Sequence, residues 1–292
     1  MKNLILISLL TIFPIININA SNYVSESYFK KDMGYDWVSV SLKDIDAHNA
    51  KISIKSRADR KKPTCTFDDV VSKSSNNEYI SYKEGKKIIF TLKDDTLSIK
   101  GENVEDENIL FYFCSGGGSL KGEYKRLYEP LDKKQIDKRN YANTLYYNQY
   151  MFFIEESNNT ISIFSPNLKY SNKPILKKID GEIIYSEIAD MNSDGNPEIY
   201  IYTNSLKDKR NYAELTAFSV NNGVSLSEIY LESLSENKKA LENFEGNDEF
   251  RVVENTLVRR FPIKGNKTKQ IQYKLISGEA SWQLKVDKIL EY

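Results

Sequence analysis

The chain has 292 residues, and its 41 Lys and Arg balance its 41 Asp and Glu to a formal net charge of zero. This balance provides no broad positive field, which excludes recognition of nucleic acid or anionic lipid through overall charge. Twenty tyrosines favour pleated, half-buried surfaces. We therefore expect an all-β protein.

The first twenty residues are typical of a secretory signal peptide. Lys2 gives a positive start, an apolar run covers residues 4–16, and small residues follow at Ala20 and Ser21. The run is too short to cross a bilayer and is followed by a plausible cleavage site. We expect cleavage after Ala20, a periplasmic or secreted protein, and no membrane insertion after cleavage. A retained N-terminal anchor is the alternative.

Residues 21–130 are predicted to form an N-terminal β domain, a small antiparallel sheet or barrel. Apolar side chains alternate with polar ones in strands expected at 51–56, 87–92 and 96–100. A fuller apolar run at 109–114 precedes three adjacent glycines, at 116–118. Such a glycine run indicates a sharp turn or a closely approached backbone.

The chain has only two cysteines, Cys65 and Cys114. Export would place both in an oxidising compartment, so we expect a disulfide between them. Two free thiols or a metal pair are the alternatives, although no third soft ligand lies nearby.

A charged, polar stretch at 131–148 is predicted to be a linker to a second β domain at 149–292. Strands are expected at 151–155, 160–165, 183–189, 199–203, 215–220, 250–263, 269–276 and 282–290. A short surface helix is expected at 234–244.

The motif DMNSDGNPE, at 190–198, resembles the start of an EF-hand-like calcium loop. The predicted ligands are Asp190, Asn192, Asp194 and Glu198 through side chains and Asn196 through its carbonyl. The bidentate glutamate of the full loop is missing, because Ile201 takes its position. The alternative is a polar turn without metal. We expect no required cofactor and treat calcium as a possible structural ion.

The sequence offers little for catalysis. His48 is the only histidine and has no nucleophile beside it, so a Ser-His or Cys-His pair would depend on it alone. We expect a surface histidine and no enzyme. The enzymatic alternative is a glycan hydrolase with two carboxylates, since spatial pairs of Asp and Glu are invisible in sequence.

The second half resembles the periplasmic inhibitors of invertebrate-type lysozyme. The resemblance starts with DMNSDGNPEIY at 190–200, and further similar blocks follow in the family's order. These blocks are FSVNNG (218–223) with SEI (227–229), NDEF (247–250), LVRRFP (257–262), and QIQYKL (270–275) with GEA (278–280). The resemblance covers about residues 150–292. It implies an antiparallel β-sandwich, secretion, independence from metals and a possible homodimer.

The resemblance also implies a partner-binding loop. In that family a loop with a Ser-Gly-x-Tyr motif enters the lysozyme cleft, and here KRNY aligns with it, as Lys209, Arg210, Asn211 and Tyr212. Lysine replaces the expected serine and arginine the expected glycine. Either cation could pair with the carboxylates of a lysozyme cleft. The predicted function is therefore a lysozyme inhibitor-like binding protein, and the alternative is a module that binds envelope glycan or another protein without inhibition.

Overall fold

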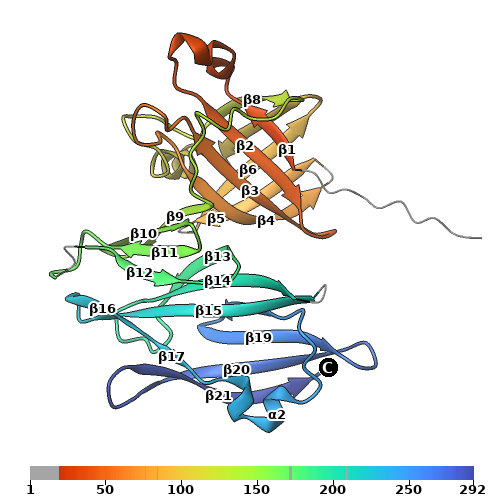
Figure 1. Ribbon diagram of the computed structural model, residues 1–292, viewed down its shortest axis with the longest axis vertical. Helices are drawn as coiled ribbons and strands as arrows, with labels where there is room; N and C mark the ends of the chain where they lie inside the picture. Colours follow the sequence, from red (N-terminus) through yellow and green to blue (C-terminus); the bar gives the residue numbers. More distant parts are fainter. Residues whose placement is uncertain (1–19, 76, 84, 171–172, 208–209) are drawn as a thin grey trace, which may run out of the picture.

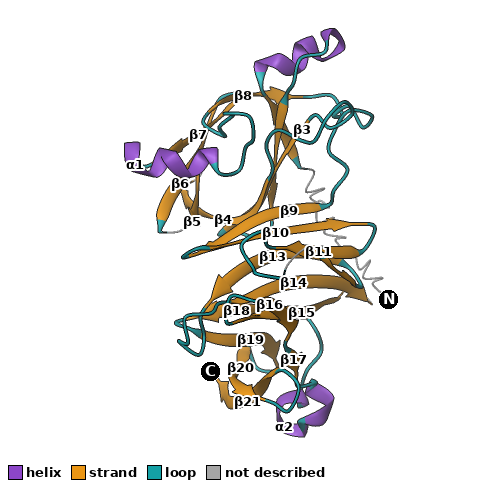
Figure 2. Ribbon diagram, turned by 90° about the vertical axis from the view of Figure 1, so that its left-hand side faces the viewer, coloured by secondary structure: helices purple, strands orange, loops and turns teal. Residues whose placement is uncertain are grey.

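The computed structural model describes residues 20–292 apart from residues 76, 84, 171–172 and 208–209. The expected signal peptide therefore lies outside the described residues, except for Ala20. The described chain is all-β, as the composition predicted. Figures 1 and 2 show a barrel at one end of the long axis and three sheets stacked beneath it.

Eight antiparallel strands close into the N-terminal barrel, in the order in which they occur along the chain. Closure comes from β1, which pairs with both β2 and β8. The strands are β1 (Ser21–Val24), β2 (Val38–Asp44), β3 (Asn49–Ser56), β4 (Phe67–Ser75), β5 (Glu78–Lys83), β6 (Lys86–Lys93), β7 (Thr96–Gly101) and β8 (Gly122–Leu127). The sequence was compatible with either an antiparallel sheet or a barrel, and the structure shows a closed barrel.

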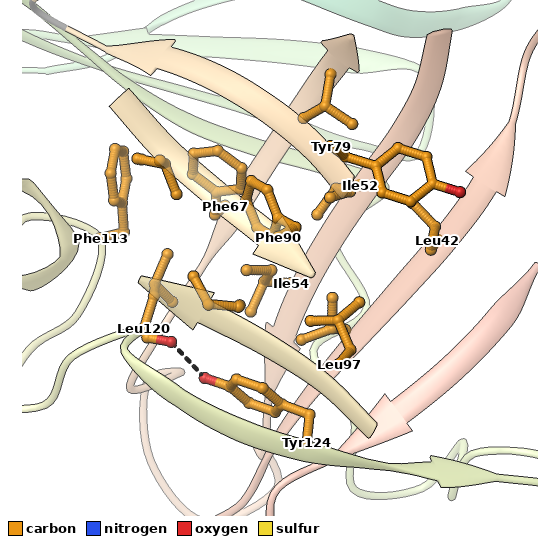
Figure 3. Packing of buried hydrophobic residues seen from close by; sticks show 14 of the residues in the cluster. Leu42, Ile52, Ile54, Phe67, Tyr79, Phe90, Leu97, Phe113, Leu120 and Tyr124 are labelled. Atoms are coloured by element: carbon orange, nitrogen blue, oxygen red, sulfur yellow. Dashed lines mark hydrogen bonds between the residues drawn. The ribbon is translucent and has the colours of Figure 1, made fainter. Parts of the chain in front are cut away.

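Side chains fill the barrel interior. In β3 every second residue is buried, as the alternating sequence predicted. Figure 3 shows Phe67, Phe90 and Phe113 meeting in the middle of the barrel, where the rings of Phe67 and Phe113 lie 4.8 Å apart. Tyr124 is also buried, and its hydroxyl donates to the carbonyl of Leu120 at 2.9 Å. The barrel is thus a packed core.

Short helices lie on the connections of the barrel, η1 (Glu26–Met33) between β1 and β2, and α1 (Val104–Glu107) with η2 (Asn108–Phe111) between β7 and β8. The predicted disulfide is confirmed: Cys65 and Cys114 are bonded, 49 residues apart in sequence. It joins the segment before β4 to the segment after η2. No helix among the described residues is long and apolar enough to cross a membrane.

The second half consists of three sheets. The first sheet contains β9 (Tyr141–Tyr147), β10 (Tyr150–Ser157), β11 (Thr160–Phe164) and β12 (Ile175–Lys178). The second contains β13 (Glu182–Ala189), β14 (Glu198–Lys207), β15 (Arg210–Asn221) and β16 (Ser225–Glu228). The third contains β17 (Tyr230–Leu231), β18 (Glu249–Val253), β19 (Thr256–Ile263), β20 (Lys267–Ser277) and β21 (Trp282–Glu291).

The second sheet is covered on both faces. On β14, Ile199 and Ile201 belong to the core shared with the first sheet, whereas Tyr200 and Tyr202 belong to the core shared with the third sheet. A strand that is buried on both faces becomes apolar at successive positions, which explains the unbroken run at 199–202. The resemblance implied a sandwich, and the structure shows three stacked sheets in this half.

The predicted linker at 131–148 is partly wrong, because β9 lies inside it. The charged composition ends at Asn140, and the following residues pair with β10 from Tyr141 onward. Sheet pairing therefore outweighs the polar character of the whole window. The expected surface helix at 234–244 is represented by two short helices, η3 (Leu234–Glu236) and α2 (Lys238–Leu241).

The barrel sits on the stacked sheets through β4, which contacts β9 and β13. At this junction a carboxylate oxygen of Asp68 accepts the backbone N–H of Ala142 at 2.9 Å. Beside it, the Tyr141 hydroxyl and the Ser186 hydroxyl lie 2.7 Å apart, and the Asn143 amide donates to Ser186 at 3.1 Å. The domain junction is therefore a buried, hydrogen-bonded contact.

We expect the double variant Cys65→Ala/Cys114→Ala to lose stability in the barrel. In the chain-entropy model, a bridge closing a loop of this length stabilises by about 4 kcal/mol, because it restricts the unfolded chain. Urea unfolding followed by tryptophan fluorescence would measure the loss against the oxidised protein. A loss below about 1 kcal/mol would show that the bridge does not constrain the barrel.

Candidate functional site

The predicted partner-binding loop is the end of a β-hairpin. Strands β14 and β15 stay paired as far as Lys207 opposite Arg210, so Arg210, Asn211 and Tyr212 lie in a strand and not in a loop. The polar side chains of this segment did not indicate a strand. The backbone hydrogen bonds that pair two strands do not depend on side-chain polarity. Lys209 lies outside the described residues.

Tyr212 lies at the base of this hairpin end and is half-buried. Its ring packs edge to face on Phe244, with centroids 6.1 Å apart. Gly246 lies so close that a Cβ there would be 3.1 Å from the ring of Tyr212. The predicted anchor is thus held against its own domain.

The neighbours of Tyr212 are also engaged within the chain. Arg210 is paired with Glu245 at 3.5 Å, and both side chains are largely exposed. The backbone N–H of Asn211 donates to the Asn247 side chain at 3.1 Å. The most exposed apolar residue of this hairpin end is Leu206, at 72%. A partner reaching the hairpin would therefore meet Leu206 and Arg210 before Tyr212.

The 190–198 loop forms a compact turn between β13 and β14. The Asp190 carboxylate accepts the backbone N–H groups of Asp194 at 3.0 Å and Gly195 at 2.9 Å. Gly195 has φ +83°, a conformation that favours glycine. In the described part of the chain, no group of three or more His, Cys, Asp or Glu is placed to hold a metal ion. The calcium site of Asp190, Asn192, Asp194, Asn196 and Glu198 stays a prediction.

Glu198 is the most unusual carboxyl group of this loop. Its side chain is fully buried, and the Met191 N–H and the Ser219 hydroxyl donate to it at 2.9 and 3.3 Å. Burial penalises the charged form and raises the pKa of Glu198 to about 7, because the two hydrogen bonds offset only part of the penalty.

His48 lies exposed on the turn between β2 and β3, where its backbone N–H donates to the Asp46 carboxylate at 2.7 Å. The prediction of a surface histidine is confirmed. It contributes to none of the pockets described below.

A cleft with a volume of about 520 Å³ lies at the seam between the barrel and the first sheet. One wall comes from the barrel side, with Thr64, Tyr112 and Ser115 next to the disulfide. The opposite wall comes from β9, β10 and the segment before them, with Arg139 and Phe153. A volume of this size is in the range of small-ligand sites.

A second pocket of about 220 Å³ continues along the same seam. The two pockets share Phe113 and Thr144 in their walls. Tyr112 of the larger pocket and Tyr146 of the smaller pocket have ring centroids 5.3 Å apart. We refer to the two pockets together as the seam groove.

Three of the four charged side chains that line the larger pocket are paired with one another. Arg139 donates to the Asp137 carboxylate at 2.9 Å and is ion-paired with Glu155 at 2.5 Å. Thr64 provides the contrast: its hydroxyl oxygen is buried and has no hydrogen-bond partner among the described residues. A buried hydroxyl without a partner costs free energy.

The sequence did not predict the seam groove. The walls of its larger pocket alone come from four separate segments, around residues 62–66, 112–115, 137–144 and 153–155. The available signals were the glycine run beside Cys114 and the aromatic residues on either side of the predicted linker. Neither signal indicates that these segments meet.

No family model and no curated protein match the chain. Among solved structures, it is similar to the WD40 domain of coronin from Toxoplasma gondii, with 10% identity and a TM-score of 0.29. That match covers 87% of this chain and spans only 56% of the coronin chain. Drosophila Plexin A in complex with Semaphorin 1b is also similar, with 11% identity, a TM-score of 0.28, and coverage of 92% and 71% of the two chains. TM-scores at this level support no inference about fold or function.

The raised pKa of Glu198 predicts that the stability of the folded protein depends on pH. The unfolded chain loses this proton near the usual pKa of 4.5, whereas the folded chain keeps it until about pH 7. The folded state therefore binds more protons between these values, and the contribution of Glu198 to stability falls as the pH rises through this window. The full effect is at most about 3 kcal/mol, from 1.36 kcal/mol per pKa unit.

Thermal unfolding between pH 4.5 and pH 8, with a chelator present, measures this effect. We expect Glu198→Gln to remove most of the decline in the melting temperature that the unmodified protein shows. An equal decline in both proteins would assign the effect to other groups.

Proposed function

We propose that this chain is an exported, non-catalytic binding protein of the cell envelope that takes its ligand in the seam groove. The observation that carries the proposal is the pair of exposed aromatic side chains in the larger pocket, Tyr112 at 52% and Phe153 at 36% exposure. Exposed aromatic rings in a concave site provide contact area at little cost in conformational entropy. Export rests on the signal sequence described above.

The carboxylates of the groove favour binding over hydrolysis. A two-carboxylate hydrolase needs one carboxyl group free to donate a proton and the other free to act as base or nucleophile. Asp137 and Glu155 are both engaged by Arg139 in ion pairs. Neither is thus arranged as a general acid.

The proposal predicts that the purified protein sediments with peptidoglycan sacculi. We expect Tyr112→Ala combined with Phe153→Ala to weaken this binding about tenfold or more, since aromatic anchors often contribute over 1.4 kcal/mol each. Tyr128→Ala is the matched control, because Tyr128 is an exposed barrel aromatic, at 79%, outside the groove. Undiminished binding by the double variant, or no binding by the unmodified protein, would contradict the proposal.

A second candidate function is inhibition of lysozyme by the end of the β14–β15 hairpin. The resemblance supports this candidate, together with the exposed Leu206 and Arg210 near the hairpin end. The half-buried ring of Tyr212 would then support the hairpin from below, and residues closer to the end would contact the enzyme. Nothing in this candidate uses the seam groove.

An activity assay with invertebrate-, chicken- and goose-type lysozymes tests this candidate. If the hairpin inhibits, we expect Leu206→Asp to weaken inhibition at least about tenfold without lowering the unfolding temperature, because Leu206 has little packing to lose. Tyr212→Ala should lower the unfolding temperature, since it removes a ring packed on Phe244. Absence of inhibition in all three assays would rule the candidate out.

A further inference from the structure

We infer that the ligand of the seam groove is the sugar chain of a neutral glycan, several residues long. The inference rests on the proposed function and names the chemistry of its ligand. Four observations support it: the aromatic faces, the unpaired hydroxyl, the balance of charge and the adjacency of the two pockets.

The aromatic side chains of the larger pocket are held in place by neighbouring rings. Phe153 stacks on Phe164 with an interplanar angle of 11° and a centroid distance of 6.4 Å. Tyr112 lies tilted against Tyr146 at 5.3 Å. Such rings can present fixed faces to a ligand. Pyranose rings have one face made largely of C–H groups, and this face packs well on an aromatic ring.

Small polar side chains lie between these rings. The buried Thr64 hydroxyl has no partner among the described residues, and Ser115 and Thr144 line the same pocket. A hydroxyl can donate one hydrogen bond and accept others, which matches the mixed donor and acceptor character of sugar hydroxyls. A sugar hydroxyl in the groove would give Thr64 the partner that the protein does not supply.

The charges of the groove balance in each pocket. The larger pocket is lined by Lys62 and Arg139 against Asp137 and Glu155. The smaller pocket is lined by Lys83 against Glu187. Each pocket thus has equal numbers of cations and carboxylates. A phosphate-bearing ligand would need an excess of unpaired cations, so a neutral ligand fits this groove better.

The two pockets lie next to each other along the seam. They share Phe113 and Thr144, and the Tyr112–Tyr146 pair joins their rims. A single sugar would occupy one pocket, whereas a chain of several sugars can contact both. Sugar chains that pass through both pockets would therefore bind more tightly than monosaccharides.

Isothermal titration calorimetry with chitohexaose, cellohexaose and N-acetylglucosamine tests the inference on the intact protein. We expect at least one hexaose to bind and the monosaccharide to bind at least about tenfold more weakly. The same hexaose should displace the protein from peptidoglycan sacculi. Binding of chitohexaose alone would support an N-acetylated chain, and binding of both hexaoses would support recognition of the pyranose ring.

Thr64→Val is the decisive variant, because affinity and stability should change in opposite directions. Removing a buried hydroxyl that has no partner should leave the unfolding temperature unchanged or raise it. Hexaose affinity should fall about fivefold or more, since the sugar loses a hydrogen-bond partner. Tyr128→Ala serves again as the control, with unchanged affinity expected. An unchanged hexaose affinity in Thr64→Val would overturn the role of this hydroxyl.

The failures of the two proposals are distinguishable. If sacculi binding depends on Tyr112 and Phe153 but neither hexaose binds or competes, the glycan inference is overturned and the groove remains the binding site. If the protein does not bind sacculi and neither hexaose binds, both proposals are overturned. If a hexaose binds equally well to the Tyr112→Ala/Phe153→Ala variant, the sugar site lies outside the groove and the inference is again overturned.

Discussion

The hydrogen bond from the Ala142 N–H to the buried Asp68 carboxylate joins β9 to β4 where the two halves of the chain meet. Burial raises the pKa of Asp68, because burying its charged form costs free energy. A hydrogen-bond donor such as the Ala142 N–H offsets part of this cost. Through β4, the barrel covers the otherwise open edge strands β9 and β13. The seam groove lies beside this contact, along the junction between the barrel and the sheets.

The sequence predicted those features that depend on local pattern. Alternation in β3 and the two cysteines were sufficient for a disulfide-linked β domain, since side-chain period and cysteine pairing follow simple rules. The β9 strand and the hairpin end of the β14–β15 ladder were missed because backbone pairing overrides polar side chains. The seam groove could not be predicted, since the walls of its larger pocket alone join four segments that only the folded chain brings together.

The groove departs from the rule that local features agree with the global fold. In the barrel core of Figure 3, by contrast, the apolar side chains are buried and pack on one another. In the groove, Tyr112 and Phe153 remain exposed, and the Thr64 hydroxyl is buried without a partner. Such departures cost stability and are expected where a protein meets a ligand. At the end of the β14–β15 hairpin, by contrast, the Tyr212 ring packs on Phe244 and the Arg210 side chain is ion-paired with Glu245.

Amide chemical-shift mapping of the isotope-labelled protein during titration with chitohexaose would locate the ligand on the protein. We expect the shifts to concentrate in the walls of the larger pocket, at residues 62–66, 112–115, 137–144 and 153–155. Shifts confined to the hairpin end near Leu206 and Arg210, with the seam unchanged, would contradict this expectation.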